Sequence, residues 1–447
     1  MELTTESVLA LAPDDSSVKA ARGLVAPGKW PTLGFDDAVV WGECKGSGAK
    51  PYQVEVELSG PTFKCSCPSR KFPCKHALAL LLLRLAHEAS FSRGEAPDWV
   101  KEWLDSRQKR AARQEEKKEK GQPADPAAAA RREASRLRRM AAGLDDLERW
   151  MCDIVRHGLD QLENDSRWAE ETAARMVDAQ LPGIAARLRS LHGVTFSRGG
   201  WTPGDWTQIL LAQFGQFQLL IDAFRRIDAL PPAEQQDIRA ALGLAPDKDT
   251  VLASGERVRD EWLVLGVSHL EEDKLWSRRV WLRGQAHGRT ALLLDFSHGG
   301  KQFDQSFLPG SLVSLTLAFY PGAAPLRAIA AEAPVLSGTA PVPTVPLRAA
   351  LEDMARRVAA QPWLWPLPML VSDGIPSRKD DVWYLQTPEG DCLPLELEEN
   401  DGWRLLAQGG GSPLSVWGEW DGLRLRPVSA WEPGASGAPL WREGVGL

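Results

Sequence analysis

The chain has 447 residues, of which 43% are hydrophobic and 25% charged, a composition that is typical of globular proteins and excludes a disordered chain. This length exceeds the usual size of a single hydrophobic core and predicts several domains. The formal net charge of -7 gives the protein as a whole no attraction to nucleic acid or anionic membranes, so any such binding has to be local. No signal-like start and no apolar run near the ~20 residues of a membrane span are evident, so we expect a cytoplasmic protein with no membrane partner.

Residues 1–113 predict an N-terminal segment of short helices and strands. The expected elements are a helix, the two strands of a β-hairpin and two further helices, over residues 15–23, 38–44, 52–58, 77–89 and 98–113. The hairpin and the helix after it flank a cluster of cysteines. We therefore expect a ββα unit over about residues 36–90.

Residues 114–139 predict a charged linker. This stretch contains Glu and Lys in alternation, two prolines, four consecutive alanines and an arginine-rich end, and its basic residues outnumber the acidic ones. It lacks the apolar periodicity with which a helix packs on a core. We therefore expect a mobile connection between two separable modules.

The remainder of the chain predicts a helical domain over residues 140–250 and a mainly β domain over residues 251–447. Apolar residues recur at helical spacing in the first part. The second part contains β-rich runs punctuated by Gly and Pro, one helix at residues 347–360 and no evident repeat with a period of 20–50 residues. The strands are expected at residues 261–270, 275–283, 290–296, 311–320, 382–386 and 403–406. The predicted fold class is α+β multidomain, with an N-terminal ββα finger, a central α-helical domain and a C-terminal mainly β region that is barrel-like or split.

Three of the six cysteines and a histidine form a C-x-C-x6-C-x-H cluster made of Cys65, Cys67, Cys74 and His76. In an extended segment residues i and i+2 point the same way, so the first two thiols can face one point. The other two ligands would lie at the first turn of the following helix, whose positive end favours a thiolate. The cluster therefore predicts one Zn²⁺ ion. The remaining cysteines are isolated and are expected in hydrophobic cores, at Cys44, Cys152 and Cys392.

Four protein ligands leave no open coordination position, so the predicted zinc is structural and not catalytic. Three thiolates give the centre a net charge of about -1. Four basic residues surround it, at Lys64, Arg70, Lys71 and Lys75. They either offset this charge and lower the pKa of the thiols, or form a patch for phosphate groups.

The cluster closely resembles the SWIM-type zinc finger, whose pattern is C-x-C-x(n)-C-x-H within a strand-strand-helix unit. The cluster itself and the phrase from Ala174 to Gly183 are similar to bacterial stand-alone SWIM proteins. The resemblance implies one bound zinc ion and a role in DNA or protein interaction. It also implies protein partners, namely a MoxR-type ATPase and a von Willebrand A-type protein.

Familiar enzyme motifs are absent from the sequence. There is no G-x-x-x-x-G-K-[ST] phosphate loop, no H-E-x-x-H zinc motif and no G-x-S-x-G elbow, so we expect no enzyme. The leading interpretation is an adaptor that binds protein partners. The alternatives are a nucleic-acid-binding protein that uses the basic finger and linker, and a hydrolase in the C-terminal half that no motif reveals.

Overall fold

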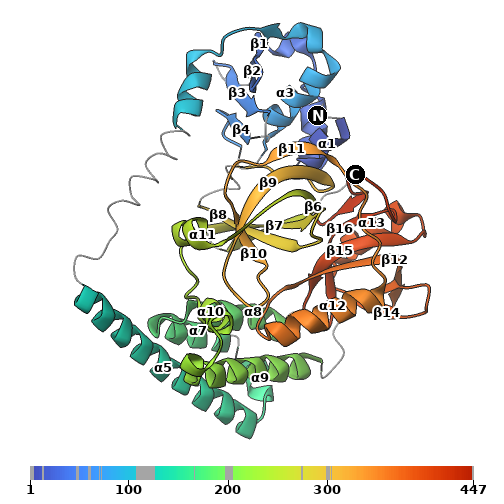
Figure 1. The fold of residues 1–447 in the computed structure, drawn as a ribbon. Helices are drawn as coiled ribbons and strands as arrows, with labels where there is room; N and C mark the ends of the chain where they lie inside the picture. The colour runs from blue at the N-terminus through green and yellow to red at the C-terminus, as the bar shows by residue number, and fades with distance from the viewer. Residues whose placement is uncertain are drawn as a thin grey trace.

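The computed structural model describes residues 5–444 apart from residues 13–14, 47–49, 59–61, 70, 72, 107–125, 166, 197–204, 273–274, 299–302 and 304. Figure 1 shows an N-terminal module, a β region next to it and a helical domain on the opposite side of that β region. The protein thus combines several sheets with a central helical domain, as the multidomain α+β prediction expects. Over the described ranges, no helix is both long and apolar enough to cross a membrane.

The N-terminal module is a five-stranded sheet with helices on both faces. Its strands are hydrogen-bonded in the order β4-β3-β2-β1-β5. In chain order the strands are Thr32–Phe35 (β1), Val39–Cys44 (β2), Tyr52–Glu57 (β3), Thr62–Cys65 (β4) and Ser92–Arg93 (β5). The helices are Thr5–Ala10 (α1), Asp15–Arg22 (α2), Lys75–Ala86 (α3), the short turns Pro27–Lys29 and Glu88–Ser90, and a helix at 98–106. The predicted hairpin is confirmed by the antiparallel pairing of β2 with β3, and the ββα unit is part of this larger sheet.

Alternation along the strands gives the sheet two apolar faces. Val54 and Val56 of β3 share one core with α3. Trp41 of β2 lies in a second core with Val100 and Trp103 from the helix at residues 98–106. The sheet therefore needs a helix on each side to remove its apolar faces from water.

The central domain is a bundle of helices around one hydrophobic core. The helices of the bundle are Pro126–His157 (α5), Asp160–Asn164 (α6), Trp168–Asp178 (α7), Pro182–Phe196 (α8), Asp205–Arg225 (α9), a turn at Ile227–Ala229 and Pro232–Leu242 (α10). The short helix Lys248–Ser254 (α11) follows the bundle and lies against the β region. The structure differs from the predicted linker at residues 126–139, which form the first turns of α5. The rest of that linker, residues 114–125, lies outside the described residues.

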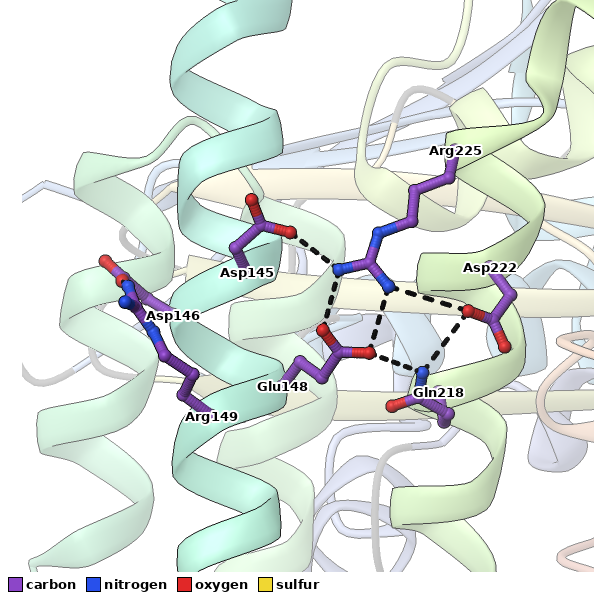
Figure 2. Close-up of polar contacts among 7 residues, drawn as sticks. All are labelled: Asp145, Asp146, Glu148, Arg149, Gln218, Asp222 and Arg225. Carbon is purple, nitrogen blue, oxygen red and sulfur yellow. Dashed lines mark hydrogen bonds and ion pairs between the residues drawn. The ribbon is translucent and has the colours of Figure 1, made fainter.

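A charged network joins α5 to α9 (Figure 2). The Arg225 guanidinium donates to Asp145 Oδ1 at 2.7 Å and to Glu148 Oε2 at 2.6 Å, and both carboxylates lie on α5. Gln218 Nε2 also donates to Glu148, at 2.7 Å. The hydrogen bonds from Arg225 lower the pKa of Glu148 to about 2. One arginine thus holds two helices of the bundle in register.

The C-terminal region consists of two closed β-barrels. The first barrel is the cycle β6-β7-β8-β10-β9, closed by β9 pairing with β6, and the second is the cycle β12-β13-β14-β16-β15, closed by β15 pairing with β12. The first barrel contains Glu256–Glu272 (β6), Leu275–Gly284 (β7), Thr290–His298 (β8), Ser311–Phe319 (β9) and Arg327–Ala330 (β10), with Val335–Thr339 (β11) beside β9. The second contains Leu367–Lys379 (β12), Val382–Gln386 (β13), Cys392–Leu395 (β14), Leu414–Trp420 (β15) and Leu425–Trp431 (β16), with Trp441–Arg442 (β17) beside β16. Two helices belong to this region, Leu347–Ala360 (α12) and Glu399–Gly409 (α13).

The two barrels share one connectivity. In each barrel three strands form an antiparallel meander, the fourth returns to the first, and the fifth pairs in parallel with the third, as β8 with β10 and β14 with β16. This five-stranded Greek-key barrel is the arrangement of the OB fold. The long first strand of each barrel also shifts register next to a glycine, at Gly266 in β6 and at Gly374 in β12. The β region is therefore a structural duplication.

One predicted strand is wrong, because residues 403–406 lie in α13. This helix has acidic residues in its first turn and buries Gly402 and Leu405. It ends at Gly409, and its C-cap residue Gly410 adopts the left-handed conformation with φ of 57° that suits glycine. A run of four residues is too short to separate a period of 2 from a period of 3.6.

The barrels pack on each other through a core of their own. Trp281 of β7 lies edge-on to Trp417 of β15, with ring centroids 5.9 Å apart. The indole N–H of Trp281 donates to Glu419 Oε1 at 2.8 Å, and Arg279 Nη1 pairs with Glu419 Oε2 at 2.9 Å. A buried carboxylate from one barrel is thus satisfied by two donors from the other, which fixes how the barrels sit together.

Two buried polar contacts attach the bundle to the barrels. Asp237 of α10 accepts a hydrogen bond from the backbone N–H of Ala323 at 2.8 Å, and burial raises the pKa of this carboxyl to about 6. Arg187 of α8 donates to the backbone carbonyl of Trp363, which lies between α12 and β12. Burial also lowers the pKa of Arg187 to about 10. The bundle and the barrels are therefore joined by specific hydrogen bonds.

Replacing Arg225 by Ala should lower the free energy of unfolding of the bundle by about 1 kcal/mol, because two carboxylates on α5 lose their shared partner. The matched control is Arg149→Ala, whose pair with Asp146 is exposed and lies within α5, and it should cost less than ~0.5 kcal/mol. The pKa of Glu148 is depressed in the folded state, so the contribution of Arg225 is present above about pH 4.5 and is lost as the pH falls toward 2. Urea unfolding of both variants measures this. If both variants lose the same free energy of unfolding at pH 7, Arg225 does not bridge the two helices.

Candidate metal centre

The four predicted ligands converge at the junction of β4 and α3. Cys65 ends β4, Cys67 follows in the loop, Cys74 is the N-cap residue of α3, and His76 lies in its first turn. Their ligand atoms all lie within 4.8 Å of one another. The Nδ1 atom of His76 is 3.9 Å from Cys65 Sγ and 4.0 Å from Cys74 Sγ. The structure therefore brings together the complete ligand set.

This donor set fits zinc. Zn–S and Zn–N bonds of about 2.3 and 2.0 Å in a tetrahedron place sulfur and nitrogen roughly 3.5 Å apart, close to the distances from the imidazole to the two thiols. Hydrogen bonds from Cys65 and Cys74 lower the pKa of Cys67, and the thiol of Cys65 has a raised pKa because it donates to Cys67. Crowded thiols resist losing all their protons, whereas a divalent cation compensates the three thiolates. The four residues are thus positioned to bind one zinc ion.

The surroundings hold the ligands in place. Both Cys74 and His76 are buried, and the thiol of Cys74 accepts a hydrogen bond from the backbone N–H of Ala77. The ring of Tyr52 lies against His76 with centroids 4.9 Å apart. Tyr52 was not among the predicted site residues, because nothing in the sequence marks a tyrosine at the start of a strand as a neighbour of the metal.

Three of the four predicted basic residues are described by the structure, and their surroundings differ. Lys64 Nζ forms an ion pair with Glu55 Oε1 at 3.1 Å, and the Glu55 side chain is almost fully buried. Lys71 donates to Ser16 Oγ at 2.7 Å, and Lys75 is exposed at the start of α3. The fourth, Arg70, lies outside the described residues. Lys64 therefore has a structural partner, whereas the other two described lysines face solvent near the cluster.

Burial raises the pKa of Glu55 to about 7, although the Lys64 ammonium opposes this shift. The Oε2 atom of Glu55 has no hydrogen-bond partner among the described residues. Near neutral pH this carboxyl therefore depends on Lys64 for compensation.

The isolated cysteines are only partly as predicted. Cys44 is buried in the finger core, but Cys152 and Cys392 are exposed, so the prediction of core positions for these two is wrong. Cys152 lies on the outward side of the amphipathic α5. Alternation along β14 turns Cys392 outward, while Leu393 and Leu395 point into the barrel.

The zinc-replete chain should contain one zinc ion, because the ligand set is complete and two of its four members are buried. The double variant Cys67→Ser, Cys74→Ser should lose it, since two of three thiolates are removed. The control Cys152→Ser changes an exposed cysteine outside the cluster and should keep the zinc. Elemental analysis after dialysis measures the zinc content of each protein. Full retention by the double variant would show that the metal is held elsewhere.

Replacing Lys64 by Gln should destabilise the finger by about 1–3 kcal/mol at pH 8, because the buried Glu55 carboxylate loses its cation. The loss should be smaller at pH 6.5. The folded pKa of Glu55 lies above its unfolded value, so protonation stabilises the folded state as the pH falls through about 7. Adding Glu55→Gln should restore most of the stability. Urea unfolding of the zinc-loaded chain measures the stability of each variant. If the double variant is no more stable than Lys64→Gln alone, Lys64 does not stabilise the fold by pairing with Glu55.

Comparison with known families agrees with this geometry. Residues 52–85 match the SWIM zinc finger, and residues 135–242 match the SWIM-associated four-helix bundle domain. The first range contains all four ligands, and the second contains α7 to α10 together with most of α5. Neither curated proteins nor solved structures give a match to the chain. With its complete ligand cluster followed by the associated bundle, the chain is a SWIM-type zinc finger protein.

Proposed function

We propose that this protein is a zinc-containing, non-catalytic adaptor that binds a protein partner through its helical domain. The observation that supports this most is an exposed apolar row on α9, made of Leu211, Ala212, Gly215 and Leu219 and called here the α9 stripe. Leu211 and Leu219 are 52% and 53% exposed. Large apolar side chains that lie together on a surface mark interaction sites.

The shape of the α9 stripe suits a helix from the partner. The two leucines lie four residues to either side of Gly215, so they fall on one line along the helix. A Cβ built on Gly215 would meet nothing within 4 Å. A second helix can therefore approach the backbone of α9 at this point and pack between the leucines. The expected partner contributes an amphipathic helix.

The zinc centre supports a structural role and not catalysis. All four ligands come from the protein, and the two at the start of α3 are buried. A catalytic zinc keeps a position for water or substrate, which a complete tetrahedron of protein ligands does not provide. The finger then acts as a rigid part of the adaptor.

The barrels support a protein partner over nucleic acid. OB barrels that bind oligonucleotides use the face of their second and third strands. In the first barrel this face includes Trp281 and Leu292, which pack against the second barrel. In the second barrel the corresponding strands β13 and β14 contain no lysine or arginine. Over the residues that the structure describes, the face of the second and third strands is thus covered in the first barrel and lacks basic residues in the second, unlike the cationic groove that tracks a nucleic-acid backbone.

Nucleic-acid binding is a second candidate, favoured by the beginning of α5. Four exposed arginines lie there within nine residues, at Arg131, Arg132, Arg138 and Arg139. Such a run contacts phosphates without reading sequence. If these arginines bind nucleic acid, the affinity for an oligonucleotide should fall steeply with salt. The affinity of a protein partner for the α9 stripe should change little with salt.

The α9 stripe should be required for partner capture. The first partners to test are a purified MoxR-type ATPase and a von Willebrand A-type protein, which the SWIM resemblance suggests. We expect Leu211→Ser with Leu219→Ser to weaken binding at least tenfold in calorimetry, because both anchors of the interface are removed. The matched control is Leu423→Ser, which changes a leucine that is 46% exposed on the second barrel. Binding that survives the α9 changes would exclude this surface, and equal weakening by the control would show a nonspecific effect.

A further inference from the structure

The contact between the helical bundle and the β region buries polar atoms that have no partner. We call this contact the bundle junction; it consists of Arg187 with Trp363 and of Asp237 with Ala323. Arg187 donates from Nη2 to the backbone carbonyl of Trp363, but its Nη1 atom has no acceptor among the residues that the structure describes. The indole Nε1 of Trp363 is likewise buried without an acceptor. Both atoms are shielded from solvent, so bulk water cannot replace the missing acceptors.

The two charged groups of the bundle junction lack counter-ions. Within the described ranges no carboxylate forms an ion pair with Arg187, and burial lowers the pKa of its guanidinium to about 10. Asp237 accepts a single hydrogen bond, from the backbone N–H of Ala323, and burial raises the pKa of its carboxyl to about 6. The two groups belong to separate contacts and do not pair with each other. Docking of the bundle therefore removes two charges from water without joining them, which costs free energy.

One apolar contact opposes this cost. The ring of Trp363 packs against the hydrophobic core of the bundle, although the residue belongs to the segment between α12 and β12. Burial of this ring favours the docked arrangement. The bundle junction thus sets one aromatic contact against two uncompensated charges and an unsatisfied indole N–H. Such a balance of opposing contributions leaves the docked and undocked arrangements close in free energy.

The chain provides a hinge at the right place. It passes from the bundle into the β region once, through residues 243–247 between α10 and α11 (Figure 1). The helix α11 already lies against β9 and β10, so the connection before it separates the two bodies. Gly243 begins this connection in the left-handed conformation, with φ of 93°. Rotation about these few residues can move the bundle while both hydrophobic cores stay intact.

We propose that the bundle junction opens and closes, and that the bundle swings as a rigid body about residues 243–247. The closed form is the arrangement described above. In the open form Arg187 and Asp237 return to water, and Trp363 leaves the bundle core. Opening restores the hydration of both charges and sacrifices the apolar contact of one ring. The adaptor proposal does not depend on this motion.

The two exposed cysteines suit a direct measurement of the motion. Cys152 lies on α5 of the bundle and Cys392 on β14 of the second barrel, whereas Cys44 is buried and the other three cysteines are zinc ligands. Nitroxide labels on the zinc-loaded full chain therefore report the distance from the bundle to the barrels by double electron–electron resonance. Mass spectrometry confirms two labels per chain. We expect two distances, one for the closed form and one for the open form.

Three variants should shift the two populations in opposite directions. Arg187→Met and Asp237→Asn should each lower the open-to-closed ratio at least about fivefold, because each removes a buried charge and keeps a side chain of similar size. Trp363→Ala should raise this ratio, because its ring no longer packs on the bundle core. The matched control is Arg189→Met, which changes an exposed arginine of α8 whose partner, Glu170, lies within the bundle. It should leave the ratio unchanged.

Each alternative outcome overturns the proposal. A single distance in the unmodified sequence means that the bundle junction does not open. If Arg187→Met raises the open-to-closed ratio, the guanidinium locks the junction and does not oppose docking. An equal decrease in Arg189→Met means that the charge at the junction is not the cause. A ratio that Trp363→Ala leaves unchanged shows that the ring does not hold the closed form. None of these results bears on the α9 stripe, whose test uses other variants and a protein partner.

Discussion

Coordination of one zinc ion by Cys65, Cys67, Cys74 and His76 is the constraint on which the N-terminal module depends. Structural zinc contributes about 10–16 kcal/mol of apparent binding free energy, which equals or exceeds the whole stability of a typical domain. The ion joins the end of β4 to the start of α3 across a short loop. The packing of α3 on β3 follows from this junction. Pro73 of the same loop also lines a larger cleft together with residues of both barrels, so the zinc centre helps to place the finger beside them.

Sequence reasoning succeeds where the determining interactions are local. The zinc ligands lie within twelve residues, and their spacing alone identifies the site. The hairpin and the helices of the bundle follow from periodicity over ten to twenty residues.

The beginning of α5 is the exception. Pro126 and the alanines after it were interpreted as linker, but proline suits the first helical position and alanine is the best helix former. Their lack of apolar periodicity reflects a helix that begins before it reaches the bundle core at Met140.

The duplicated barrels could not be predicted because non-local pairings close them. The parallel pairing of β8 with β10, and of β14 with β16, joins strands separated by other elements. No local pattern encodes that contact. The inter-barrel core has the same origin, since the partners of Glu419 lie about 140 residues earlier in the chain. The duplication also escapes notice because what the two barrels share is strand connectivity, which no local residue pattern reports.

The distribution of charge disfavours binding of a long polyanion by the finger. At physiological salt, electrostatic interactions between exposed charges fade beyond about 8–10 Å. A short ligand on the finger therefore interacts mainly with the charges close to it. A nucleic-acid polymer would instead extend past the finger and meet the rest of a protein whose formal charge is -7. Lys64, held by Glu55, does not extend the cationic surface in that direction. The charge of the rest of the chain thus disfavours a long polyanion on the finger.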